Sequence, residues 1–193
     1  KQIETDKIDD FSKDIYGTDA LFKNFIRYNE MQSLIKKLDV LFSTALNYKE
    51  SQDYKKAFVI LWSLIRTIDN NIDSCDDSNG EVGDFFYECV DAISDLVNLV
   101  VVERELREKL FKEMLNLWNC NDFGIEDAFL SLIEEFANKE DSDFIINEIN
   151  NIINGRRDKY FLEYRKEELE ELKTYLENLK DGNNKKREKT SKS

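Results

Sequence analysis

At 193 residues the chain suits one domain, and its composition of 41% hydrophobic and 36% charged residues allows a core beneath a well-solvated surface. A net charge of −13 argues against nucleic-acid binding, because phosphate contacts require clustered Lys and Arg. The chain has no proline, which favours long helices, and no histidine, which removes the commonest general base.

The first segments carry apolar residues at helical spacing. Residues 3–16 predict a helix that Gly17 ends, and Thr18 is expected to cap a second helix. The apolar residues of that second helix would share one face: Leu21, Phe22, Phe25 and Ile26.

Two clear helical periods follow, over residues 31–48 and 54–68, separated by a polar break. The second is apolar around most of its circumference, so we expect it to be central. Beyond an acidic loop, further helices are predicted at 85–102, 103–118, 125–136 and 141–155. The cluster Val100–Val102 favours a strand slightly, but no partner strand is predicted elsewhere.

The last predicted helix, residues 158–180, has leucines seven residues apart. The simpler interpretation is a terminal helix that packs a narrow apolar stripe on the domain. The sharper one is a helix that forms a homodimer or docks on a partner. We therefore expect a single helical domain over residues 1–180 and a disordered polar tail over 181–193. The leucines of the stripe are Leu162, Leu169, Leu172, Leu176 and Leu179.

The cysteines, Cys75, Cys89 and Cys120, are too widely spaced for a zinc motif and odd in number. This favours free thiols in a reducing compartment. No apolar run is long enough to cross a bilayer and no signal peptide is visible, so we expect a cytoplasmic protein without a membrane partner.

The fold class is predicted to be all-α, with antiparallel helical hairpins stacked as a short α-solenoid and a long C-terminal helix. One hairpin resembles a tetratricopeptide repeat, in which small residues let two helices approach and an aromatic residue fills the space near the turn. The departures are Leu64, where the repeat prefers a small residue, and Asp69, where it prefers proline; a generic helical hairpin is the alternative. The residues that match are Leu41, Ala45, Tyr48, Ala57 and Leu61.

The acidic loop at residues 76–84 invites comparison with an EF-hand calcium loop. Alignment on Gly80 places Asp77 and Asn79 correctly, but Cys75 takes the first ligand position and Phe86 the closing one. Two essential ligands are therefore missing. A loose ion site made by Asp73, Asp76, Asp77 and Glu81 remains as an alternative.

A structural role for the loop accounts for all its residues. Gly80 can adopt the positive φ of a tight turn, and Asp76, Asp77 and Ser78 can bind local amides. Asp84 is expected to cap the helix that begins at Phe85.

The loop sequence Asp76-Asp77-Ser78-Asn79-Gly80-Glu81, between two helices, resembles the Asp-Asp-Ser-Asp-Gly-Glu signature of an uncharacterised bacterial helical family. The resemblance covers about residues 28–153. Such helical regions often follow a SWIM-type zinc finger, but this chain lacks histidine and zinc-like cysteine spacing. The resemblance implies no activity.

We expect no catalysis and no cofactor, since no phosphate-binding loop or nucleophile–base pair is evident. The leading hypothesis is a module that binds a protein or peptide through a groove between helical hairpins. The alternative is an acidic inhibitor or immunity-type protein that covers a basic site on its partner. Such an inhibitor should concentrate acidic groups with exposed aromatics, for example at Asp84, Phe85, Phe86 and Tyr87. A metal-dependent enzyme is the third hypothesis.

Overall fold

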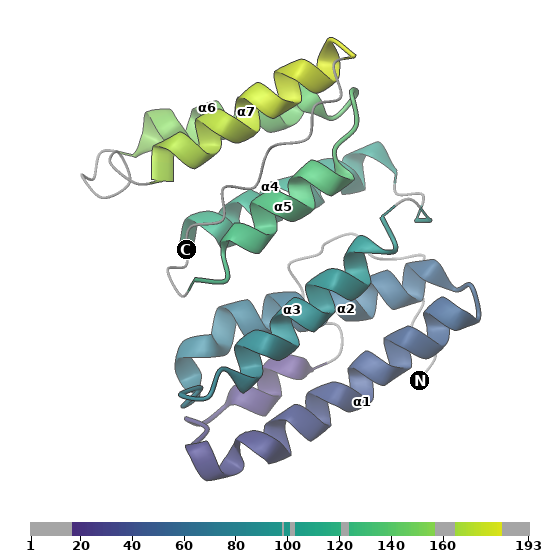
Figure 1. Cartoon of the computed structure of the whole chain (residues 1–193), viewed down its shortest axis with the longest axis vertical. Coiled ribbons are helices and arrows are strands. Elements are labelled where there is room, and N and C mark those ends of the chain that lie inside the picture. The colour runs from purple at the N-terminus through teal and green to yellow at the C-terminus, as the bar shows by residue number, and fades with distance from the viewer. Residues whose placement is uncertain (1–16, 98, 101–102, 121–123, 157–164, 183–193) are drawn as a thin grey trace. The chain divides into compact units, whose positions relative to one another are not determined.

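The computed structural model describes residues 17–97, 99–100, 103–120, 124–156 and 165–182. Within these residues every regular element is a helix, as predicted, and the only β pairing is one isolated bridge. The elements in Figure 1 are η2 Thr18–Phe22, η3 Tyr28–Glu30, α1 Met31–Glu50, α2 Tyr54–Asn71, η4 Ile72–Ser74, α3 Glu81–Ser94, α4 Arg104–Cys120, α5 Asp127–Phe136, α6 Ser142–Gly155 and α7 Lys166–Lys180.

The chain divides into two compact units, residues 1–132 and 133–193, with the boundary inside α5. Each unit is described by itself. The single domain expected over residues 1–180 stays a prediction beside this division.

The first unit is built on the hairpin of α1 and α2, which pack on each other more extensively than any other pair of helices described. Gln52 turns the chain between them with a left-handed φ of 64°. Asp53 then caps α2 by accepting a hydrogen bond from the backbone N–H of Lys56 at 3.4 Å. Figure 1 shows α3 running beside this hairpin.

As predicted, α2 is central, since its residues from Ala57 to Ile65 are all buried. Around it the first unit is joined by aromatic contacts: Trp62 and Phe86 both meet Phe129 edge to face, at centroid distances of 6.4 and 5.9 Å. Arg66 of α2 also pairs with Glu113 of α4 at 3.6 Å. These contacts attach α3, α4 and the start of α5 to the central helix.

The second unit contains α6 and α7, which lie side by side in Figure 1. Leu169, Leu172 and Leu176 are fully buried, so the apolar stripe of α7 is covered by its own chain, as the simpler interpretation predicted. The homodimer through this helix stays a prediction. Leu162 lies outside the described residues.

Polar contacts fix α7 in the second unit. The Tyr175 hydroxyl donates to the backbone oxygen of Glu134 at 3.0 Å, and Lys173 donates to the Asn150 side chain at 3.1 Å. Lys180, the last residue of α7, pairs with Asp143 at the start of α6.

Two sequence predictions need correction. The segment from Thr18 forms only the 3-10 helix η2, whose N-cap is Gly17 and not Thr18 as predicted. Because η2 ends at Phe22, Phe25 and Ile26 lie beyond it: Phe25 is exposed, and Ile26 pairs with a distant segment. The helix expected at 85–102 is α3, which begins at Glu81 and ends at Ser94. The predicted helix at 3–16 and residues 183–193 of the predicted tail lie outside the described residues. No described helix is long and apolar enough to span a membrane.

Candidate functional site

The acidic loop caps α3, but through a different residue from the one predicted. The Asp77 carboxylate accepts hydrogen bonds from the backbone N–H groups of Val82 at 2.9 Å and Gly83 at 3.0 Å. These amides belong to the first turn of α3, where the helix itself offers no acceptor. The prediction that Asp84 caps a helix starting at Phe85 is therefore wrong, because Asp84 already lies inside the first turn.

The turn itself has the predicted glycine. Gly80 has φ 75°, a left-handed conformation that a side chain would strain, and its N–H donates to the Asp77 carbonyl at 2.9 Å. The Ser78 hydroxyl donates to the Asp76 carboxylate. Asp76 and Ser78 thus bind each other, whereas Asp77 alone binds the amides of α3.

The loop is tied to the segment that precedes α1. The Ile26 N–H donates to the Ser74 carbonyl and the Asp76 N–H donates to the Ile26 carbonyl, both at 2.9 Å. The Asn79 side chain donates to the Tyr28 hydroxyl at 2.9 Å. In Figure 1 the purple segment before α1 and the α2–α3 loop meet at the left-hand end of the first unit.

The aromatic residues expected at the surface are placed differently from the prediction. Phe85 and Phe86 are buried, at 5% and 0% exposure, and only Tyr87 reaches solvent, at 43%. The Tyr87 hydroxyl donates to the Gly124 carbonyl at 3.2 Å. Burial, then Asp127 and Glu126, raise the pKa of Tyr87.

The solvent face of α3 carries a row of carboxylates that sequence reasoning missed. Asp84, Glu88, Asp91 and Asp95 are spaced four, three and four residues apart, so they share one helix face, and all four are exposed. We call these four residues the acidic stripe. Asp95 pairs with Lys49 at 2.7 Å. Among the described residues, no ion pair involves the other three.

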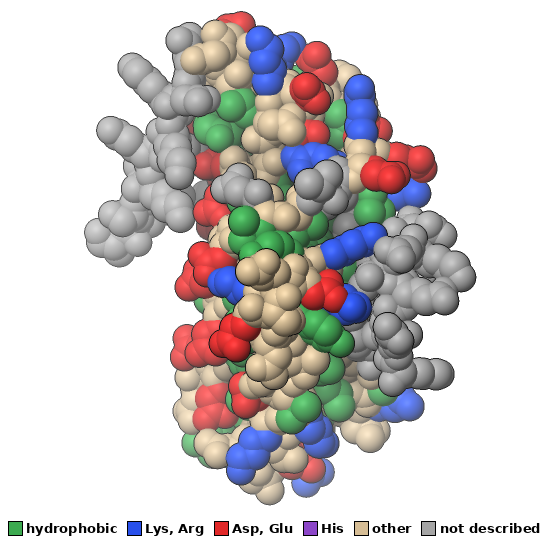
Figure 2. Space-filling model, turned by 90° about the vertical axis from the view of Figure 1, so that its right-hand side faces the viewer, with side chains coloured by type: hydrophobic (Ala, Val, Ile, Leu, Met, Phe, Trp, Pro, Cys, Tyr) green, Lys and Arg blue, Asp and Glu red, His purple; other side chains and the backbone are tan. Residues whose placement is uncertain are grey.

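A sequence signal for this stripe exists. Between Arg66 and Arg104 the chain contains ten Asp and Glu residues and no Lys or Arg. Figure 1 draws α3 in front of α2. Figure 2, turned from that view, shows acidic side chains along the left-hand side of the picture.

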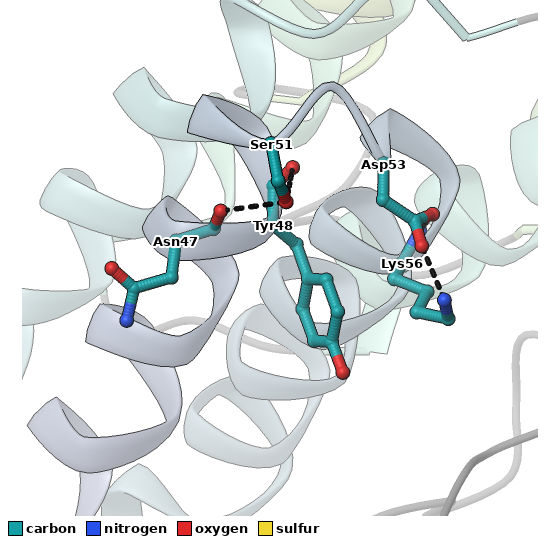
Figure 3. Close-up of polar contacts among 5 residues, drawn as sticks. All are labelled: Asn47, Tyr48, Ser51, Asp53 and Lys56. Carbon is teal, nitrogen blue, oxygen red and sulfur yellow. Dashed lines mark hydrogen bonds and ion pairs between the residues drawn. The ribbon is translucent and has the colours of Figure 1, made fainter.

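The five tetratricopeptide-like positions lie on the two helices of the α1–α2 hairpin. Ala45, Ala57 and Leu61 are fully buried, while Leu41 and Tyr48 are half-buried. Figure 3 shows the Tyr48 ring beside the turn, with the Lys56 ammonium 5.2 Å from the ring centroid.

Polar groups close the same turn. The Ser51 hydroxyl donates to the Asn47 carbonyl at 2.9 Å, and the Asp53 carboxylate binds the Lys56 ammonium (Figure 3). The Asp53 N–H donates to the Tyr48 carbonyl at 2.9 Å. Backbone carbonyls at the C-terminal end of α1 therefore have hydrogen-bond donors before α2 begins.

The comparison with known families gives one match. A model described as a family of unknown function (DUF6880) matches residues 19–192, which is most of the chain. The chain belongs to this family. No curated protein and no solved structure matches it.

Membership of DUF6880 confirms the expectation of a family without an assigned activity. The match extends beyond both ends of the region, residues 28–153, for which a resemblance was inferred. The loop signature of that resemblance, and the association of such helical regions with a SWIM-type zinc finger that this chain lacks, stay predictions.

The side chains named for the loose ion site are not grouped as metal ligands. Across the parts of the chain that the structure describes, no group of three or more Cys, Asp and Glu side chains is arranged to hold a metal ion. Asp77 instead turns both its oxygens towards backbone amides.

The thiols are free where the structure describes them, with Cys75 and Cys89 buried and Cys120 exposed. Burial, followed by the charges of Asp77, Asp73 and Asp76, raises the pKa of Cys75 to about 11. Burial also raises the pKa of Cys89 well above its usual range. Both buried thiols are therefore protonated at neutral pH and poorly suited to nucleophilic attack.

Proposed function

We propose that this chain is a protein-binding module of the cytoplasm, built from tetratricopeptide-like helical hairpins. The observation that carries the proposal is a set of large apolar side chains exposed on the first unit of a chain whose surface is otherwise strongly charged. A partner that covers such side chains removes apolar surface from water, which favours binding. They are Phe25, Tyr28, Val40, Tyr87 and Leu99.

The α1–α2 hairpin supports the proposal of a groove on the face of α1. Buried Ala45 and Ala57 suit the close helix approach of a tetratricopeptide repeat. Phe42 of α1 meets Phe85 of α3 edge to face at 5.6 Å, a contact that supports the proposal that α1 and α3 are neighbouring inner helices of such a stack. Val40, 64% exposed on α1, then offers an apolar contact to a bound peptide.

The alternative is an acidic inhibitor or immunity-type protein that masks a basic site of its partner. The observation that favours it is the acidic stripe of α3 beside the exposed ring of Tyr87. Phe85 and Phe86 take no part in such a surface, because they are buried. Both candidates act by binding, and neither requires a cofactor or a catalytic group.

Affinity capture from the native cell, with the full chain as bait, tests the proposal. Three baits are compared with the wild type: Val40→Ser on the proposed groove, Glu88→Gln on the acidic stripe, and Ser43→Ala as a matched exposed control on α1. We expect a specific partner that the wild type and Ser43→Ala retain equally.

The substitution that reduces the enrichment of the partner identifies the binding surface. Loss with Val40→Ser supports the groove, and loss with Glu88→Gln supports the acidic inhibitor. If no bait enriches any specific protein, both candidates are wrong.

A further inference from the structure

We propose that the acidic stripe of α3, together with the ring of Tyr87, binds a Lys- and Arg-rich segment of a partner protein. This inference rests on the proposed protein-binding function and specifies the chemistry of the partner.

Charge is the first argument. Asp84, Glu88 and Asp91 are exposed, and no Lys or Arg lies on α3 or its flanking loops. Lys49 of α1 forms an ion pair with Asp95, which is the last residue of the stripe. A cationic segment would therefore meet carboxylates that no basic side chain of the same helix neutralises.

Without a partner, the charges on α3 also lower the stability of the helix. Asp84 and Glu88 are like charges at i,i+4, and such pairs repel. Asp91 and Asp95 have the same spacing, although Lys49 already pairs with Asp95. Asp91 and Asp95 also stand at the C-terminal end of α3, where the helix dipole disfavours negative charge. A bound cation would reduce both the repulsion and the unfavourable interaction with the helix dipole. Binding of a basic partner would therefore stabilise α3.

Tyr87 supplies an apolar contact next to these charges. It lies one turn before Asp91 and one turn after Asp84 on the helix. Because its hydroxyl is bound to the Gly124 carbonyl, the ring is held in place while 43% of the residue stays exposed. An Arg guanidinium can stack on such a ring while it pairs with a neighbouring carboxylate.

The spacing suits a helical or turn-rich basic segment. Successive carboxylates of the stripe are about one helical turn apart, about 5–6 Å. A partner helix with Arg or Lys at i, i+3 or i+4, and i+7 presents its charges at the same interval. The chain's own basic segment, Lys185-Lys186-Arg187, is the competing occupant that the experiment must separate.

The test is fluorescence anisotropy with the full chain and a labelled helical peptide of about fifteen residues with Arg at three- and four-residue spacing. The same peptide with Gln for each Arg is the negative probe. The double variant Glu88→Gln/Asp91→Asn removes two charges from the stripe, and Asp39→Asn/Glu50→Gln removes two exposed charges from α1 as the matched control.

We expect the Arg peptide alone to bind, and its affinity to fall about tenfold in the stripe variant while the α1 control stays near the wild type. Tyr87→Ser should weaken binding several-fold. Binding should also decline as salt rises. Equal losses in the stripe variant and the α1 control would overturn the inference, because binding would then follow net charge alone.

Two further results would also overturn it. One is the absence of peptide binding at low salt. The other is much tighter peptide binding by a full chain in which Lys185, Lys186 and Arg187 are changed to Gln, since the occupant would then be the chain's own segment. If the peptide fails to bind but affinity capture succeeds through Val40, only this inference fails and the proposed function stands.

Discussion

The carboxylate of Asp77 accepts a hydrogen bond from the backbone N–H of Val82, 2.9 Å away and five residues along the chain. Its second oxygen holds Gly83. The loop between α2 and α3 therefore has a structural task that occupies its central carboxylate. The exposed carboxylates available to a partner lie further on, along the solvent face of α3.

Replacing Asp77 with Ala should lower the free energy of unfolding by about 1–2 kcal/mol, because two first-turn amides of α3 lose their acceptor. The matched variant Asp84→Ala removes an exposed carboxylate that caps nothing and should change stability by less than about 0.5 kcal/mol. Urea unfolding followed by circular dichroism measures both. Equal effects of the two substitutions would show that Asp77 acts only as a charge.

Two nearby glycines should respond in opposite directions. Gly80→Ala should destabilise the chain by about 1 kcal/mol, because φ 75° is unfavourable for alanine even though there is open space for a Cβ. Gly83→Ala lies within α3, where an added Cβ meets only ordinary contact at 3.7 Å, and it should stabilise by about 0.5–1 kcal/mol. Thermal unfolding of both variants checks this, and a stabilising Gly80→Ala would contradict the left-handed turn.

The sequence could reveal much of the helical framework, since the apolar periods of α1 and α2 stand out clearly. The predicted start of α3 is wrong because the apolar period is counted from Phe85. Val82, fully buried, already belongs to the same apolar face, three and four residues before Phe85 and Phe86. An apolar period that includes Val82 predicts an earlier start of the helix and places Asp84 on its solvent face.

The exposure of Phe25 could not be read from local spacing. Its neighbour Ile26 pairs with Ser74 and Asp76, which lie about fifty residues away in the chain, and a local apolar period contains no information about such a contact. The leucine stripe of α7 had a similar ambiguity, since its period alone did not say which surface covers it.

The thiol of Cys75 should make stability fall at alkaline pH. Its pKa is raised from 9.0 to about 11, so between these values the unfolded chain loses the proton while the native chain keeps it. The native state then binds more protons, and the free energy of unfolding decreases as pH rises, by at most about 3 kcal/mol from this residue. Below pH 9 the contribution is fully present.

The measurement is urea unfolding of the wild type and Cys75→Ala at a series of pH values from 8 to 11. Cys75→Ala should show a shallower alkaline decline, whereas Cys120→Ala, at an exposed site, serves as the control. Parallel declines in the wild type and Cys75→Ala would mean that Cys75 ionises alike in both states.

Leu172 distinguishes an intrachain role of the α7 stripe from a dimer seam. It is fully buried within a single chain, so Leu172→Ala should cost about 2–5 kcal/mol through lost burial and a residual cavity. Leu179, half-buried on the same helix, provides the milder control. Unfolding at two protein concentrations about tenfold apart should give the same Tm, because the stripe is covered by its own chain. A Tm that rises with concentration in the wild type and loses this dependence in Leu172→Ala would instead place a second copy against α7.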